Sequence, residues 1–158
     1  MRKTCLQIDI EPSWSAIANI RDTLGDLSAS LSKATKDFVQ ITATELLENA
    51  MKYRSEKNKN ENIELEFNLD HENIEIKVSN KFDNDDDLLR LISTVKKIKN
   101  ESDPKSLYEA RLKEIYDNDQ DKHNRLGLFR IIHECGFDLN CEQNETEITV
   151  IAKKHLGK

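Results

Sequence analysis

The sequence lacks several features that mark whole classes of protein. No apolar run reaches the roughly 18 residues that a membrane-spanning helix needs, so no membrane association is expected. The N-terminal residues MRKTCLQIDI contain no apolar segment of the kind that forms a signal peptide. The three cysteines, Cys5, Cys135 and Cys141, include no C-x-x-C pair, which disfavours a zinc or redox centre. We therefore expect a cytoplasmic protein whose cysteines serve as small apolar side chains.

Positively charged residues are also fewer than negatively charged ones. The chain contains 24 lysines and arginines against 30 aspartates and glutamates, which gives a net charge of -6. A general nucleic-acid binder needs a basic surface for its phosphate contacts, so no nucleic-acid partner is expected. One bound nucleotide is compatible with this charge, because a local site can neutralise its phosphates. With 158 residues, of which 37% are hydrophobic, the sequence suits a single domain.

Hydrophobic periodicity predicts the order of helices and strands. The expected strands, in which apolar and polar residues alternate, are 5–10, then 63–69 and 74–78 around the turn DHEN, then 137–141 and 148–152 around the turn QNET. The expected helices are 13–27, about 36–54, 84–100, 104–115 and 125–136. Trp14, at the start of the first helix, is expected to anchor packing. Local hairpins predict an α+β fold, a two-layer sandwich whose mixed, mostly antiparallel sheet is covered on one face by helices.

The stretch ELLENAMKY, residues 45–53, places three polar side chains along one edge of its helix. At 100° per residue, Glu45, Asn49 and Lys52 fall within about 60° of one another. A carboxylate can orient or deprotonate an attacking hydroxyl, an amide oxygen is a neutral ligand for Mg²⁺, and an ammonium group can contact phosphate. Together they suit Mg-nucleotide chemistry, and the alternative is an ordinary solvated helix face. The apolar positions lie on another side: Val39, Ala43, Leu46, Leu47 and Ala50.

ELLENAMKY resembles the N-box of the GHKL superfamily, whose members include gyrase, Hsp90, histidine kinases and MutL and share the ATP-binding Bergerat fold. The resemblance implies that Glu45 is the general base, that Asn49 holds Mg²⁺, and that Lys52 lies near the phosphates of ATP. It also implies one GHKL-like ATPase domain over residues 1–158, with a lid-like helical segment at about 81–124.

Three further stretches narrow the resemblance. VSNKFDNDDDLLRLI, SLYEARLKEIY and RLGLFRII resemble the SiaB-like protein kinases, a divergent branch of the stand-alone anti-sigma-factor serine kinases. No dimerising phosphoacceptor helix pair precedes the first expected strand in this sequence, in contrast to histidine kinases. The resemblance covers residues 5–153, and its element order is the one that periodicity predicts.

The family's adenine-binding motif, usually D-x-G-x-G, corresponds here to Asn80-Lys81-Phe82-Asp83-Asn84. Asn80 keeps an acceptor oxygen for the adenine amino group, and SiaB-like proteins often have asparagine at this position. Both glycines of the motif are absent, and Phe82 is bulky at a position where the family brings backbone close to the ligand.

The family's third motif, usually G-x-G-L, corresponds here to Arg125-Leu126-Gly127-Leu128. In the family, backbone amides of this loop meet the phosphates at a helix N-terminus, so Gly127 and Leu128 are candidate phosphate-binding residues. Arg125 either blocks the loop or offers its guanidinium to a phosphate, and the sequence leaves both open.

From the resemblance we expect a regulatory protein serine/threonine kinase of the anti-sigma or SiaB-like type, which uses ATP and Mg²⁺ in a bacterial partner-switching pathway. Its substrate is expected to be a small protein of the anti-sigma-antagonist type, and homodimer formation is left open. The missing glycines favour an alternative, a catalytically degenerate pseudokinase that acts as a protein-binding module. A third hypothesis is a scaffold that binds ATP without hydrolysing it.

Overall fold

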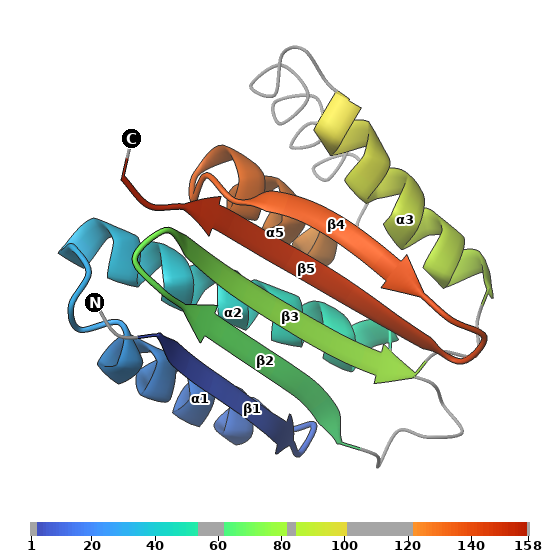
Figure 1. Ribbon diagram of the computed structural model, residues 1–158. Coiled ribbons are helices and arrows are strands. Elements are labelled where there is room, and N and C mark those ends of the chain that lie inside the picture. The colour runs from blue at the N-terminus through green and yellow to red at the C-terminus, as the bar shows by residue number, and fades with distance from the viewer. Residues whose placement is uncertain (1–2, 54–61, 82–84, 101–121, 158) are drawn as a thin grey trace.

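The computed structural model describes residues 3–53, 62–81, 85–100 and 122–157. Their elements are β1 (Thr4–Ile10), α1 (Trp14–Leu27), α2 (Lys33–Tyr53), β2 (Ile63–Leu69), β3 (Asn73–Lys81), α3 (Asp85–Asn100), α5 (Lys122–His133), β4 (Asp138–Gln143) and β5 (Glu147–His155). The strands form one sheet in the order β1-β2-β3-β5-β4 (Figure 1). The predicted α+β class is confirmed, although every pair of described strands is antiparallel and the sheet is therefore not mixed.

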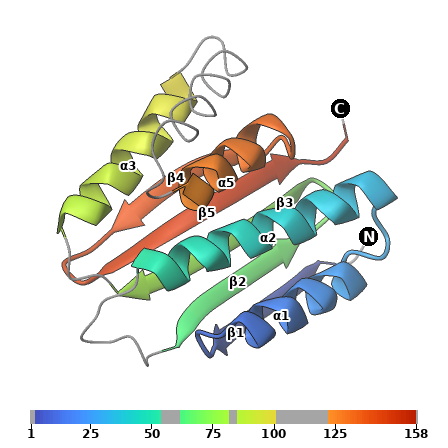
Figure 2. The ribbon, with the colours of Figure 1, turned by 180° about the vertical axis from the view of Figure 1, so that it is seen from behind.

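The described helices gather on one face of the sheet, and none of them covers its other face (Figure 1). Seen from behind, α2 lies between α1 and α5, and α3 lies beside the edge strand β4 (Figure 2). Alternate strand residues point toward the helices, which is why the burial of β2 and β3 repeats every second residue. The core fills this layer, and its largest side chains include Phe67, Phe129 and Phe137. None of the described helices is long and apolar enough to cross a membrane.

The two hairpins close on the same kind of turn. Asp70 Oδ1 accepts hydrogen bonds from the backbone N–H groups of Glu72 and Asn73, both at 2.8 Å. Asn144 Oδ1 accepts from the N–H groups two and three residues further on, at 2.9 and 2.8 Å. Short Asp and Asn side chains commonly stabilise turns in this way. Both predicted hairpins are therefore confirmed.

Helix α2 begins at Lys33, three residues before the predicted start. Ser32 caps it, because the backbone N–H of Thr35 donates to Ser32 Oγ at 3.1 Å. The helix runs to Tyr53 without a break, so the whole of ELLENAMKY is helical.

Helix α5 begins at Lys122, again three residues earlier than predicted. Gly136 follows its end with φ of 73°, and the N–H of Phe137 donates to the carbonyl of Ile131 at 3.1 Å. This hydrogen bond across a left-handed glycine is a common helix ending. The predicted role of Gly136 as a helix terminator is confirmed.

Two packing predictions are wrong. Trp14 is 65% exposed at the start of α1, so it does not anchor the core. Cys5 is exposed, whereas Cys135 is buried and Cys141 partly buried as expected of apolar side chains.

The predicted helix at 84–100 is confirmed as α3. Phe82 and the predicted helix at 104–115 lie outside the described residues.

Candidate functional site

The three polar side chains of ELLENAMKY lie in different environments along α2. Asn49 is 3% exposed and the side chain of Glu45 is 15% exposed, so a solvated helix face is the wrong interpretation for both. Lys52 is exposed near the end of the helix. The apolar positions predicted to lie on another side are buried in the core: Val39, Ala43, Leu46, Leu47 and Ala50.

Helix α5 brings the third motif against the N-box helix. Gly127 lies so close to Glu45 that a Cβ on this residue would overlap the carboxylate oxygen Oε2. Thr42, about one turn before Glu45, lies beside Cys135, just beyond the other end of α5, so α2 and α5 run antiparallel. The two motifs, far apart in the sequence, therefore meet.

Gly127 itself does not lie in a loop. It is a residue of α5, with helix on both sides, as the predicted helix at 125–136 requires, whereas the family's motif usually forms a loop there. Its small size instead allows the backbone of α5 to approach the carboxylate of Glu45. Leu128 is 2% exposed and belongs to the hydrophobic core. Arg125 lies in α5, but its side chain is outside what the structure describes.

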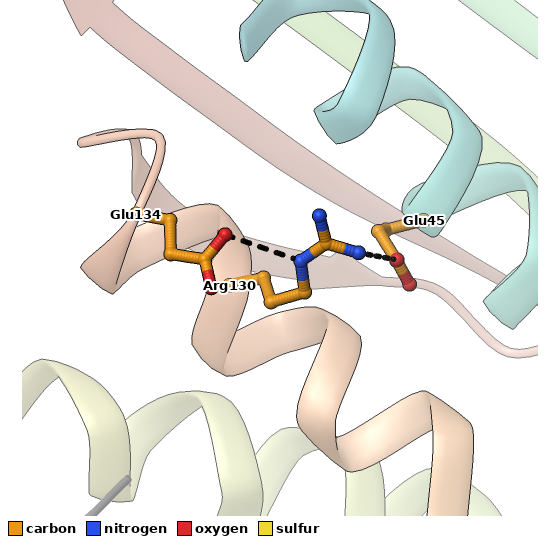
Figure 3. Close-up of polar contacts among 3 residues, drawn as sticks. All are labelled: Glu45, Arg130 and Glu134. Carbon is orange, nitrogen blue, oxygen red and sulfur yellow. Dashed lines mark hydrogen bonds and ion pairs between the residues drawn. The ribbon is translucent and has the colours of Figure 1, made fainter.

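An arginine of α5 holds the Glu45 carboxylate. Arg130 Nη1 donates to Glu45 Oε1 at 3.3 Å, and Arg130 Nε donates to Glu134 Oε2, also at 3.3 Å (Figure 3). A guanidinium is planar and permanently charged, so it can bridge two carboxylates, one on α2 and one just after the end of α5. The contact between Arg130 and Glu45 was not predicted from the sequence. The i, i+4 spacing of Arg130 and Glu134 could have indicated their pairing, but no local pattern connects Arg130 to Glu45, 85 residues away.

The surroundings of Glu45 favour its protonated form. Burial raises the pKa of the Glu45 carboxyl above its ordinary value of 4.5; Glu48 adds to the rise, Arg130 opposes it, and Glu134 adds a smaller increase. A carboxylate with a raised pKa is a better proton acceptor, which is the property that a general base needs. Burial acts to lower the pKa of Arg130, but the hydrogen bond to Glu134 and the two carboxylate charges raise it overall. Arg130 therefore stays charged.

The amide of Asn49 is buried and has no hydrogen-bond partner among the described residues. Within the described part of the chain, neither Oδ1 nor Nδ2 of Asn49 makes a hydrogen bond. Buried polar groups nearly always have partners, and an unpaired one costs about 1–3 kcal/mol. An amide without a partner in the described structure, one helical turn from Glu45, is therefore a candidate ligand contact.

Asn80 is the residue predicted to contact the adenine. It lies near the end of β3, on the side facing the helices, and is 7% exposed. Its Nδ2 donates to the backbone carbonyl of Lys81 at 3.1 Å. With Nδ2 engaged, Oδ1 is the atom that can accept a hydrogen bond from a ligand. Because α2 packs on β3, Asn80 and the N-box helix belong to the same side of the sheet.

Comparisons with known proteins give a match in structure but not in sequence. No family model and no curated protein matches the sequence. One solved structure that matches is the crystal structure of the SiaB–SiaC complex from Pseudomonas aeruginosa, in which a chain gives a TM-score of 0.71. The match covers 94% of this chain and 89% of that chain, with 17% sequence identity. The chain described here thus shares its fold, over nearly its whole length, with a chain of the SiaB–SiaC complex.

Proposed function

We propose that this protein is a regulatory ATP-binding protein serine/threonine kinase of the SiaB-like type, acting in a bacterial partner-switching pathway. The observation that carries the proposal is the buried amide of Asn49, which has no hydrogen-bond partner in the described part of the chain and lies one turn from the partly buried carboxylate of Glu45. The shared fold with a chain of the SiaB–SiaC complex supports it. The resemblance of ELLENAMKY to the GHKL N-box indicates Mg-ATP as the expected ligand.

The residues present fit Mg-ATP. Mg²⁺ keeps most of its shell for water and phosphate oxygens, so one amide oxygen from the protein is an ordinary contribution, and Asn49 Oδ1 has no competing donor among the described residues. Asn80 has its Oδ1 available for the adenine amino group. Lys52 and Arg125, at the end of α2 and in the first turns of α5, are the cations that we assign to the phosphates. Gly127 supports the site by letting α5 approach Glu45.

In this proposal Glu45 acts on the acceptor. Its carboxylate would accept the hydrogen bond, and then the proton, of a serine or threonine hydroxyl on the partner protein, with Arg130 fixing its orientation. When bound, Mg²⁺ would neutralise phosphate charge. Catalysis of phosphoryl transfer depends mostly on positioning and charge neutralisation, which these side chains can supply without covalent chemistry.

The proposed partner is a small protein of the anti-sigma-antagonist type. The solved neighbour is a complex of two proteins, SiaB and SiaC, so its fold is compatible with binding a protein partner. A partner hydroxyl has to reach Glu45, whose side chain is 15% exposed.

A second function is favoured by the ion pair between Glu45 and Arg130. The Arg130 guanidinium opposes the rise in the pKa of Glu45, and it occupies the carboxylate oxygen Oε1 that an acceptor hydroxyl could otherwise use. Together with a third motif that is helical instead of a glycine loop, this contact favours a pseudokinase that keeps the fold as a protein-binding module. The third hypothesis, a scaffold that binds ATP without hydrolysing it, is intermediate between the kinase and the pseudokinase.

Thermal unfolding with and without Mg-ATP tests these functions. A ligand present at 100 times its Kd stabilises the folded state by about 2.7 kcal/mol, so binding raises the melting temperature. We expect such a rise in the parent protein and none in Asn49→Ala. No rise in the parent, even with its partner protein present, would sink the kinase proposal and select the binding module.

Phosphate transfer then separates kinase from scaffold. With labelled ATP and a candidate partner protein, we expect transfer by the parent and loss of transfer in Glu45→Ala, whose melting temperature should still rise with Mg-ATP. Binding of Mg-ATP with no transfer to any partner would select the scaffold.

A further inference from the structure

A groove runs over the outer surface of the helical layer, where α2 lies between α1 and α5 (Figure 2). Its volume is about 610 Å³. Arg21 and Asp22 of α1 form one wall, Thr44, Glu45 and Glu48 of α2 line the middle, and Arg130 of α5 stands on the other side. The groove therefore reaches the same carboxylate that the proposed function assigns to the acceptor.

The groove and Asn49 lie on opposite sides of Glu45. At 100° per residue, Asn49 lies about 40° from Glu45 in the direction of the sheet, and Glu48 about 60° away in the direction of solvent. The burial agrees, because Asn49 is 3% exposed whereas Glu48 is partly exposed and lines the groove. A group entering the groove thus meets Glu45 from the outside, while a ligand of Asn49 meets it from the inside.

The groove carries an excess of negative charge. Four carboxylates line it, those of Asp22, Asp37, Glu45 and Glu48, against the guanidinium groups of Arg21 and Arg130. Glu45 is paired with Arg130, and Asp37 with the exposed Lys33 at 3.3 Å.

Two of these carboxylates remain open to a cationic occupant. Over the described ranges, neither Asp22 nor Glu48 has an ion pair. Thr44 Oγ1, which also borders the groove, is buried with no hydrogen-bond partner in the same part of the chain. The groove therefore offers unpaired acceptors along α1 and α2.

We infer that this groove binds a basic segment of the partner protein and brings that segment's hydroxyl to Glu45. The inference rests on the proposed function for the role of Glu45, but the charge preference follows from the groove alone. Lysine or arginine side chains flanking the acceptor would face Asp22 and Glu48, and complementary charges of this kind set specificity and association rate. A second copy of this chain, with a net charge of -6, matches an acidic groove poorly.

Peptide binding without nucleotide tests the groove directly. The probe is a fluorescein-labelled 11-residue peptide with one central serine flanked by two arginines on each side, and its counterpart carries glutamate in place of arginine. By fluorescence anisotropy at low salt we expect the basic peptide to bind and the acidic one not to bind. The double variant Asp22→Asn/Glu48→Gln should weaken binding of the basic peptide roughly tenfold.

The matched control is Glu142→Gln/Glu145→Gln, which makes the same change in net charge at the exposed β4–β5 hairpin. We expect its affinity to stay within roughly twofold of the parent's, since distant exposed charges are screened. Equal weakening in the two double variants would mean that only net charge matters, and would overturn the inference. A dimer in sedimentation that the groove variant dissociates would assign the groove to a second copy and overturn it too.

The inference and the proposed function fail separately. Asn49→Ala should lose stabilisation by Mg-ATP and keep the affinity for the basic peptide. Groove-dependent peptide binding in a protein that Mg-ATP does not stabilise would support the docking surface and reject the kinase. Stabilisation by Mg-ATP with peptide binding indifferent to Asp22 and Glu48 would reject the docking surface and leave the kinase proposal intact.

Discussion

The backbone of Gly127 lies against the carboxylate of Glu45, and it leaves no room for a Cβ between them. This one contact joins the N-box helix to the segment that resembles the family's third motif. It also fixes the separation of α2 and α5 at the point where Arg130 reaches across.

The first prediction concerns this contact. Gly127→Ala should lower the free energy of unfolding by about 1–3 kcal/mol, because an added methyl group overpacks the site. An alanine inside a helix is otherwise favourable by about 1 kcal/mol, so the sign of the change is diagnostic.

The control is Gly25→Ala in α1, where the Cβ would also meet the end of a side chain, the amide of Gln40. Moving Gln40 disturbs one exposed hydrogen bond to the carbonyl of Arg21, whereas moving Glu45 disturbs its ion pair with Arg130. Urea unfolding should show a much smaller loss for Gly25→Ala.

The second prediction concerns the unpartnered amide. Asn49→Leu keeps the volume but removes two buried polar atoms that have no partner in the described structure, so it should raise the free energy of unfolding by about 1–3 kcal/mol. Stabilisation by Mg-ATP should disappear in the same variant. Asn19→Leu, at an exposed position of α1, serves as control and should change stability by less than about 0.5 kcal/mol. Destabilisation by Asn49→Leu would show that the amide has a partner in the apo protein.

The third prediction concerns pH. The pKa of Glu45 is raised in the folded protein, so the folded state holds a proton that the unfolded state has already released. Stability therefore falls as the pH rises from 4.5, the ordinary value, through the raised pKa. Glu45→Gln should lack this fall. Urea unfolding of both proteins between pH 4 and 7 should show the difference in their stabilities changing in favour of the variant as the pH increases.

The fourth prediction concerns Arg130. Arg130→Met removes the cation that opposes the effect of burial, so the pKa of Glu45 should rise further. Glu134→Gln removes a carboxylate that raises it, so that variant should move the pKa in the opposite direction. The pH at which stability falls should shift upward in Arg130→Met and downward in Glu134→Gln. Shifts in the same direction in both variants would contradict the proposed electrostatics of this cluster.

The fifth prediction concerns Lys154, which ties β5 to the end of α5. Its ammonium donates to the carbonyl of Cys135 at 2.9 Å and lies 5.5 Å and 5.7 Å from the ring centroids of Phe38 and Phe137. Lys154→Met should cost about 1–2 kcal/mol through the lost hydrogen bond and cation–π contacts. Its exposed neighbour offers a control, and Lys153→Met should leave the melting temperature nearly unchanged.

Local patterns were enough to predict the elements of the fold. Alternation at Ile63, Leu65 and Phe67 predicts a half-buried strand, and all three are buried as expected. The turn chemistry of Asp70 is equally local, since its hydrogen bonds span two and three residues. Such features need only neighbouring residues, which is why they can be read without a structure.

The candidate site was predicted less completely, because its contacts are not local. The helical edge carrying Glu45 and Asn49 follows from spacing, but the burial of Asn49 depends on how α5 and β3 pack around α2. Arg130 has no pattern that points to Glu45. For Trp14 the residue type suggested burial, but its position at the first residue of α1 leaves the side chain outside the core.

Strands β3 and β5 are neighbours in the sheet, with Lys81 opposite Glu147. The chain between those two positions contains α3, α5 and the edge strand β4, which pairs with the far side of β5. For a flexible loop, each doubling of length adds only about 0.6 kcal/mol to the entropy of closure. A change of length in the stretch between β3 and α5 should therefore cost little closure entropy and leave the pairing of β3 with β5 unchanged.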